Sequence, residues 1–221
     1  MANPTKLLTT PTSFTAANPY VITTDAAHTA GNPIVVVLSC PPTTGPSVTD
    51  QVGNVYLLLF SQSNSTFEQV QLWVSNGAIA LPSGNTITAS FTTLTGTGLM
   101  GAVQCPGYPS NNDSFHSGTG NSATPNDATG VTTKAVSTLV FCAWAVASAT
   151  GGAATEDGAF TTVYDQVHSG SAHRLHLAYL VKAASGATTY SATTPGSARW
   201  AIGLAGIGAG GSYRSSTGAG V

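Results

Sequence analysis

The chain has 221 residues, of which 6% are charged, and six Lys and Arg against eight Asp and Glu give a formal net charge of −2. Roughly a quarter of the residues are charged in an ordinary globular protein. Six basic residues are too few to form a surface that neutralises phosphate groups. We therefore expect neither nucleic acid nor an anionic membrane as a partner. Hydrophobic residues make up 42% of the chain, which is enough for a core and excludes disorder through high charge.

The rest of the chain is mostly Thr, Ser, Asn and Gly, so charge repulsion does little to keep copies apart. This composition predicts a protein that is packed against neighbours. The three cysteines, Cys40, Cys105 and Cys142, form no CxxC pair, and we expect all three to be unpaired. No signal peptide follows Met1, and no apolar run is long enough to span a membrane.

The first half of the chain is predicted to form strands. Segments 34–40 (IVVVLSC) and 55–60 (VYLLLF) are apolar on both faces, which is typical of central strands. Segment 68–75 alternates, with its Val and Leu residues inward and Trp73 outward. Segment 86–93 alternates more cleanly between Thr or Ser and apolar residues.

The second half continues the pattern. Segment 173–182 alternates most clearly, and further strands are predicted at 160–167, 188–193 and 199–207. Segment 138–146 (TLVFCAWAV) is apolar throughout; a helical phase fits it too, but its flanks have no caps and a strand is favoured.

These elements predict an all-β protein, an antiparallel, jelly-roll-like β-sandwich of about nine or ten strands. We expect an N-terminal arm over residues 1–30, a sandwich domain over 31–207 and a Gly-rich C-terminal tail over 208–221. Residues 106–133 are a long polar stretch that favours a loop. No internal repeat is visible in the sequence.

The search for chemistry finds little. Glu156 and Asp157 lie together on a predicted turn, where adjacent carboxylates point apart, so a solvated turn is favoured over a catalytic pair. His168 and His173 face each other across a predicted hairpin and could share a metal ion. His176 points to the other face of the sheet, so we favour a cross-strand polar pair without metal.

Nucleophile and cofactor motifs are missing, so we predict no catalytic residue, no metal and no cofactor. The candidate interaction residues are aromatic or cationic. Trp73, Tyr108 and Tyr213 could stack on a sugar, and Trp73 could instead meet a neighbouring subunit. Tyr213 and Arg214 are the large side chains of the tail and its expected anchors.

Ten short segments share one further pattern. They are 48–56, 70–73, 84–90, 126–130, 139–145, 163–166, 168–173, 175–182, 190–193 and 199–202. Over about residues 30 to 207 this pattern resembles a group of β-sandwich structural proteins of tailed bacteriophages, of the head decoration or the tail and fibre type.

The resemblance implies a non-enzymatic virion protein, and first of all a capsid decoration (cement) protein that clamps neighbouring subunits of the head. The alternative is a tail or fibre protein that binds a host glycan. Its partners would be the major capsid protein or tail subunits and further copies of itself, with a trimer as one candidate. It would lie on the outer surface of the virion after assembly in the host cytoplasm. The resemblance implies no active-site residues.

Overall fold

The computed structural model of the chain describes residues 2–15, 17–64, 68–93, 96–134, 137–147, 155–156, 159–168, 173–194 and 198–208. These residues form strands and no helix, which confirms the predicted all-β class. The described part contains seventeen strands, more than the nine or ten predicted. It holds no helix that is long and apolar enough to cross a membrane.

The strands of the first half of the chain are β1 (Thr5–Lys6), β2 (Thr12–Thr15), β3 (Tyr20–Thr23), β4 (Ile34–Cys40), β5 (Ser47–Asp50), β6 (Tyr56–Asn64), β7 (Glu68–Ser75), β8 (Thr86–Ser90) and β9 (Thr97–Gln104). Those of the second half are β10 (Asn112–Ser122), β11 (Asn126–Thr133), β12 (Thr138–Ala147), β13 (Thr155–Glu156), β14 (Thr161–Val167), β15 (Arg174–Lys182), β16 (Gly186–Thr193) and β17 (Ala198–Ile207).

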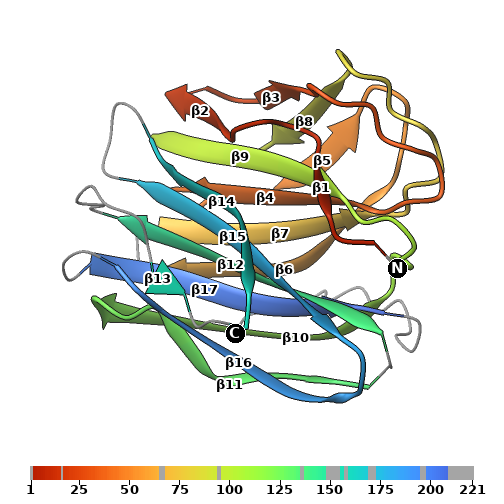
Figure 1. Ribbon diagram of the computed structural model, residues 1–221. Helices are drawn as coiled ribbons and strands as arrows, with labels where there is room; N and C mark the ends of the chain where they lie inside the picture. The colour runs from red at the N-terminus through yellow and green to blue at the C-terminus, as the bar shows by residue number, and fades with distance from the viewer. Residues whose placement is uncertain are drawn as a thin grey trace.

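Four sheets are stacked in layers (Figure 1). The N-terminal outer sheet has the order β3-β8-β5, and the N-terminal inner sheet the order β1-β9-β4-β7-β6, with β2 also paired to β9. The C-terminal inner sheet follows with the order β10-β17-β12-β15-β14, and the C-terminal outer sheet has the order β11-β16-β13. The two inner sheets form a β-sandwich, and each of its outer faces carries a further sheet, which holds one of the predicted strands, β8 or β16.

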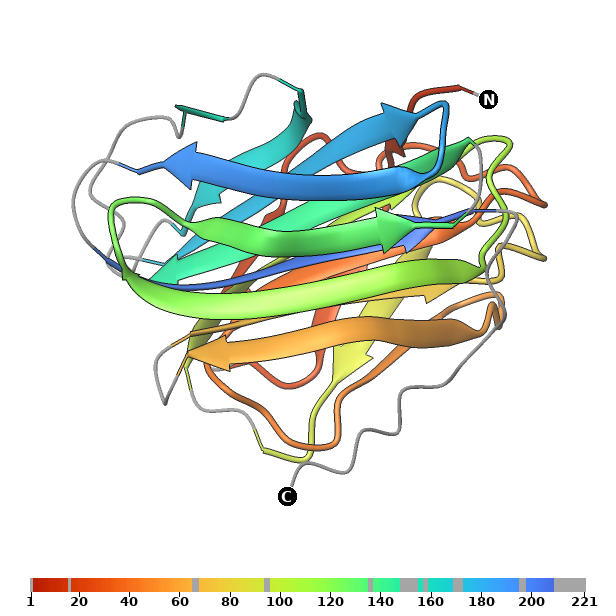
Figure 2. The same cartoon turned by 90° about the horizontal axis from the view of Figure 1, so that it is seen from below.

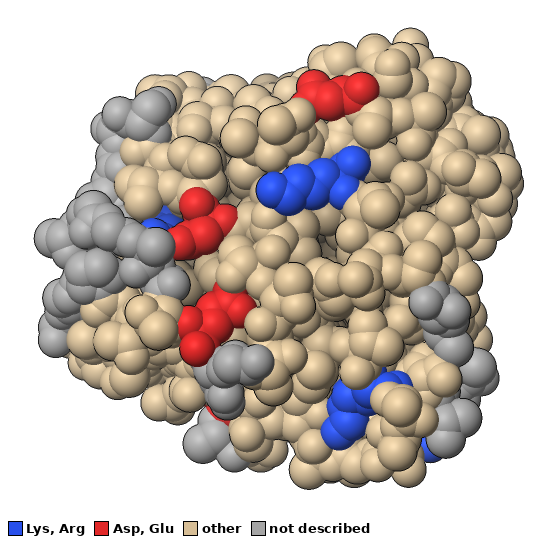
Figure 3. Space-filling view, viewed as in Figure 1, with Lys and Arg blue, Asp and Glu red and all other residues tan. Residues whose placement is uncertain are grey.

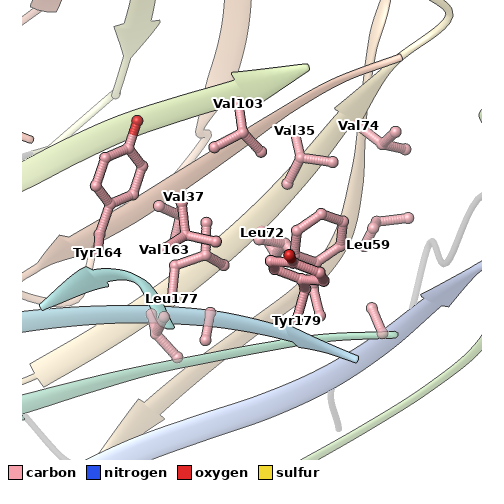
Figure 4. Close-up of a cluster of buried hydrophobic side chains, with 14 of the residues drawn as sticks. Val35, Val37, Leu59, Leu72, Val74, Val103, Val163, Tyr164, Leu177 and Tyr179 are labelled. Carbon is pink, nitrogen blue, oxygen red and sulfur yellow. The ribbon is translucent and has the colours of Figure 1, made fainter. Parts of the chain in front are cut away.

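Three separate apolar cores fill the spaces between these layers. The central core lies between the two inner sheets, and Figure 4 shows part of it, including Val35, Leu72 and Leu177. The two lateral cores lie between each inner sheet and its outer sheet. Each fully buried Val or Leu contributes about 1.5–3 kcal/mol through removal of apolar surface from water.

The inner strands explain the segments that are apolar on both faces. In β4, Val35 and Val37 enter the central core, whereas Val36 enters the N-terminal lateral core. In β12, Phe141 and Trp144 divide in the same way between the central and the C-terminal lateral core. The strand prediction for 138–146 is confirmed, since β12 pairs with both β15 and β17.

The two halves of the chain have the same strand order. Counting β2–β9 and β10–β17 each as strands one to eight, both inner sheets contain the order 1-8-3-6-5. Both outer sheets have the order 2-7-4. The sequence shows no repeat, but the topology of the chain is duplicated.

A β-bulge recurs at the same place in both halves. The register shifts between Leu58 and Phe60 in β6, and again between Thr162 and Tyr164 in β14, the equivalent fifth strand. An extra residue in a strand interrupts the alternation of side chains. Leu59 and Phe60, like Val163 and Tyr164, therefore both enter the central core.

Residues 106–133 are not the long loop that their composition favoured. They form β10 and β11, and β10 pairs with β17 along its whole length. Figure 2 shows β10 running beside β6, where Ser117 Oγ donates to Gln62 Oε1 at 2.7 Å and Asn64 Nδ2 donates to the Gly120 carbonyl at 2.8 Å. The partly exposed strand β10 consists of small polar residues, a composition also typical of loops.

Residues 1–30 differ from the expected arm because they contain β1, β2 and β3, which pair with β9 and β8. Their contacts reach the second half of the chain. The Tyr164 hydroxyl oxygen lies 2.7 Å from the Ala102 carbonyl oxygen and 3.0 Å from the Leu8 carbonyl oxygen, so its single proton can be donated to either.

Candidate functional site

Trp73 is not exposed, so the prediction that it faces outward is wrong. Only 6% of it is accessible, and it packs in the N-terminal lateral core beside Val36 and Ile87. Its Nε1 donates to Gln71 Oε1 at 3.1 Å, and Gln71 donates to Gln69 Oε1 at 2.9 Å. The polar face of β7 is covered by the N-terminal outer sheet, so this tryptophan cannot stack on a sugar without unfolding of that layer.

Tyr108 is buried as well, which corrects its assignment to an interaction surface. It is 2% exposed and belongs to the central core, and its hydroxyl has no hydrogen-bond partner in the described part. Tyr213 and Arg214, the other two predicted interaction residues, lie outside the described residues.

The predicted facing of His168 and His173 is confirmed, but their side chains go to different partners. The His168 amide donates to the His173 carbonyl at 2.8 Å. His168 Nε2 lies 2.9 Å from the Phe14 carbonyl, whereas His173 Nδ1 lies 2.5 Å from Glu68 Oε2. Within the described residues, no group of three or more His, Cys, Asp and Glu has an arrangement that could hold a metal ion.

Glu68 is a fully buried carboxylate at the central core, and residues from both halves of the chain surround it. Its Oε1 accepts a hydrogen bond from Ser39 Oγ in β4 at 2.8 Å, and its Oε2 contacts His173, just before β15. Burial raises the pKa of Glu68, and the contacts with His173 and Ser39 only partly offset this. The hydrogen bond with Glu68 raises the pKa of His173.

A second polar cluster lies on the opposite face of β15, in the C-terminal lateral core. Arg174 binds Asp165 of β14 through two hydrogen bonds, of 2.6 Å from Nε and 2.9 Å from Nη2. His176 lies between two carboxylates, with Nε2 2.5 Å from Glu156 Oε1 and Nδ1 3.6 Å from Asp165 Oδ1. Neither ring nitrogen has hydrogen-bond geometry, so these contacts are ion pairs by distance.

Glu156 therefore does not lie on a solvated turn. Its side chain is 10% exposed, it belongs to β13, and it also accepts a hydrogen bond from Thr162 Oγ1. Asp157, its predicted neighbour on the turn, lies outside the described residues. The pairing of β13 with β16 carries Glu156 over the C-terminal inner sheet and against His176.

Two competing effects set the pKa values in this second cluster. Burial raises the pKa of Asp165, but His176 and Arg174 outweigh it and lower that pKa to about 2. Burial lowers the pKa of His176, but contacts with Asp165 and Glu156 outweigh it and the net shift is upward. The His176 ring also stacks on Trp144, with centroids 4.6 Å apart and planes 10° from parallel.

The two clusters meet at Arg174. The Ser39 hydroxyl lies 3.4 Å from the Arg174 carbonyl, while the Arg174 side chain holds Asp165 on the other face of the sheet. We call the connected set Ser39, Glu68, Glu156, Asp165, His173, Arg174 and His176 the polar network. It links the N-terminal inner sheet, the C-terminal inner sheet and β13.

The geometry of the polar network is that of structural ion pairs. Ser39 donates to Glu68, and the imidazole of His173 lies on the other carboxylate oxygen. In the described part the Ser39 hydroxyl therefore bonds the carboxylate directly, whereas the serine of a Ser-His-Asp triad bonds the imidazole. Arg174 and His176 are almost wholly buried, as is Glu68.

Other charged side chains are also held by the chain itself. Asp50 Oδ1 accepts three backbone amides of the turn that follows it, and its Oδ2 accepts the Tyr56 hydroxyl at 3.1 Å. Lys182 donates to the carbonyls of Gly186 and Ala187. Asp127 lies 2.7 Å from His116.

The three cysteines are free and buried, in agreement with the prediction that they are unpaired. Burial raises the pKa of Cys105, and burial together with Glu156 and Asp127 raises that of Cys142. A thiol with a high pKa stays protonated at neutral pH and is therefore a poor nucleophile.

Comparisons with protein-family models, with curated proteins and with solved structures found no match to this chain.

Proposed function

We propose that the protein is a non-enzymatic structural component of a bacteriophage virion and acts as a capsid decoration (cement) protein on the head. The observation that carries the proposal is that the chain has few charged residues and that several of them are buried in the polar network. Six basic and eight acidic residues are few for 221, and the polar network alone takes up three of the acids and one arginine. The face in Figure 3 accordingly shows isolated charged side chains on a largely uncharged surface.

An uncharged surface of Thr, Ser and Asn favours association with neighbours. Two such surfaces meet without like-charge repulsion, and each hydroxyl can both donate and accept a hydrogen bond across an interface. Large interfaces with capsid subunits, and with further copies of the chain in a homo-oligomer such as a trimer, are the proposed use of this surface.

The strand order supports the finer assignment of the fold. We propose that each half is a jelly roll, in which strands 1-8-3-6 form one sheet and 2-7-4 the other, and in which the fifth strand pairs with the sixth. The two jelly rolls would then be fused in one chain and packed through their larger sheets. Jelly rolls are common in viral capsid domains.

Rebinding of the protein to phage heads tests the assignment. Heads of the phage that encodes this chain, stripped of it by mild denaturant, should rebind the purified protein up to a fixed number of copies and become more heat-resistant. Deletion of residues 209–221 should leave the described fold intact and weaken rebinding, if the tail is an attachment element. Stripped heads that do not bind the protein would contradict the decoration role.

A tail or fibre protein with a glycan-binding role is the second candidate. Of the residues predicted to stack on a sugar, Trp73 and Tyr108 are buried, which removes most of its support. A glycan array probed with the full chain separates the two roles, because only the second requires a sugar ligand.

A further inference from the structure

The polar network contains more acid than base. Glu68, Glu156 and Asp165 carry three negative charges when ionised, against the single positive charge of Arg174. The two imidazoles, His173 and His176, are the only other members that can carry charge. With all three carboxylates ionised, the network is electrically neutral when both imidazoles are protonated.

Burial makes this balance important. Side-chain exposure is 0% for Glu68, 1% for His176 and 4% for Arg174. Loss of both imidazole protons would leave two uncompensated negative charges among these groups, and an unpaired buried charge is strongly destabilising. The alternative, protonation of a carboxylate, would remove the ion pair itself.

The network also joins parts of the molecule that are distant in the sequence. β13 has only two residues, paired with Thr193 and Ala192, and Glu156 in β13 is its link to His176. Glu68 and His173 come from different halves of the chain and meet at the edge of the central core. A change in charge therefore acts on β13 and on the contact between the halves together.

We propose that the polar network is a proton-dependent clamp. With His173 and His176 protonated, it holds β13 against the C-terminal inner sheet and locks the two halves at this end of the sandwich. When the pH rises and these protons leave, β13 detaches and this end of the central core loosens, while the apolar remainder of the core stays packed.

Other titratable groups lie near the carboxylates that pair with the two imidazoles. Cys40 and Tyr20 lie near Glu68, and Cys142 and Tyr190 lie near Glu156. Burial raises the pKa of all four, so they stay neutral through the range in which the histidines titrate. His168, next to His173 across the hairpin, has its Nε2 2.9 Å from the Phe14 carbonyl oxygen.

The direction in which pH changes the stability follows from the pKa shifts of the network residues. Raised pKa values of His173 and His176 give stability that is present below the ordinary histidine value of 6.5 and is lost as the pH rises through the folded values. The raised pKa of Glu68 acts in the same direction, because the folded state holds that proton more tightly. The lowered pKa of Asp165 acts only in acid, as the pH falls through about 2.

Urea unfolding of the full chain from pH 6 to pH 9 tests the clamp. The equilibrium constant for unfolding should rise about tenfold for each unit by which each folded histidine pKa exceeds 6.5. Amide hydrogen exchange, corrected for its intrinsic pH dependence, should increase at Thr155 and Glu156 and not in the middle of β12. A flat unfolding constant over this range would overturn the proposal.

A pair of variants locates the effect. The double variant His173→Gln, His176→Gln keeps amide donors but its side chains at these positions cannot take up a proton, so it should lose the part of the pH dependence that the two imidazoles contribute and keep the part from Glu68. The control His116→Gln removes a histidine that pairs with Asp127 outside the network, and it should keep the wild-type dependence. A double variant that titrates like the wild type would overturn the proposal.

The wild-type chain gives a result even where the double variant does not fold. Nitrogen chemical shifts of the imidazole rings report their charge directly in ¹⁵N-labelled protein. We expect both rings, His173 and His176, to titrate above the ordinary histidine value of 6.5. Rings that titrate at or below 6.5 would overturn the clamp.

Discussion

Asp50 organises the turn between β5 and β6 through one carboxylate. It accepts the amides of Val52, Gly53 and Asn54, and it also holds the Asn54 side chain and the buried Tyr56 hydroxyl. Loss of a partner leaves buried donors unsatisfied, at about 1–3 kcal/mol for each such group.

Asp50→Ala should therefore lower the free energy of unfolding by about 2–4 kcal/mol, since at least Asn54 and Tyr56 lose their acceptor. Urea denaturation at pH 7 measures this. Asp25→Ala is the matched control, because Asp25 accepts one amide, from Thr9, at the surface. Equal effects of both substitutions would contradict the role given to Asp50.

The ion pair between Asp165 and Arg174 gives a prediction about the stability of the protein at low pH. Asp165→Asn leaves Arg174 buried without its counter-charge and should destabilise the protein by about 2–3 kcal/mol at pH 7. Because the pKa of Asp165 is about 2, the wild type keeps its advantage down to pH 4 and loses it as the pH falls through 2. Urea unfolding of both proteins from pH 7 to pH 2 should show the two curves converging. A difference that is constant with pH would show that the carboxylate charge is not what stabilises the pair.

The element scale shows what the sequence could predict. The alternation of β8 indicated its inward face correctly, because Ile87 and Ala89 are buried. In β15 both faces are buried and the predicted inward Val181 is exposed. The segments that are apolar on both faces correctly indicated central strands. That pattern does not show, however, how many further sheets pack on the sandwich. Trp73 was misplaced for that reason, since a Gln-rich face is normally exposed.

The polar network was missed because its contacts connect distant parts of the chain. Glu68 and His173 are 105 residues apart, and no local spacing brings them together. The histidines themselves were noticed, and their opposite faces were assigned correctly. A single acidic residue at the start of an otherwise uncharged strand, as Glu68 is in β7, is the one signal that could have marked it.

Gly130 lies in β11 at a point where the backbones of β11 and β16 approach closely. It has φ of +64°, and an added Cβ would lie 2.0 Å from the Thr188 carbonyl oxygen in β16. Gly130→Ala should cost more than 2 kcal/mol, because backbone must move in addition to the strain of a positive φ, which is about 1 kcal/mol. Gly84→Ala, with φ of +83° and open space around the Cβ position, should cost only the strain. Similar melting temperatures for the two variants would contradict the close approach of β11 to β16.

At the scale of the whole molecule, the central core joins the two halves. Each half alone would expose the inner face of a five- or six-stranded sheet, with residues such as Val74 and Phe141. Large exposed apolar faces lead to aggregation or association.

Fragments 1–109 and 110–221 should therefore be insoluble or molten when expressed alone and should form a 1:1 complex when refolded together. Size-exclusion chromatography with light scattering measures this. Val74→Asp in the central core should abolish complex formation, whereas Val21→Asp, on the exposed face of β3, should not. Two fragments that fold independently and ignore each other would show that the central core is dispensable.

The duplicated strand order has a consequence for symmetry. Counting from the two bulges, Leu58 pairs with Trp73 and Thr162 pairs with Ala178, so Trp73 is equivalent to Ala178 and Glu68 is equivalent to His173. These equivalent positions contact each other across the central core. In a dimer of identical subunits, a position that meets its own copy at the twofold axis must meet the same residue, Glu against Glu or His against His, and like charges repel there. Within one chain the two equivalent positions are encoded separately, so an acid at one position can face a base at the other, as Glu68 faces His173.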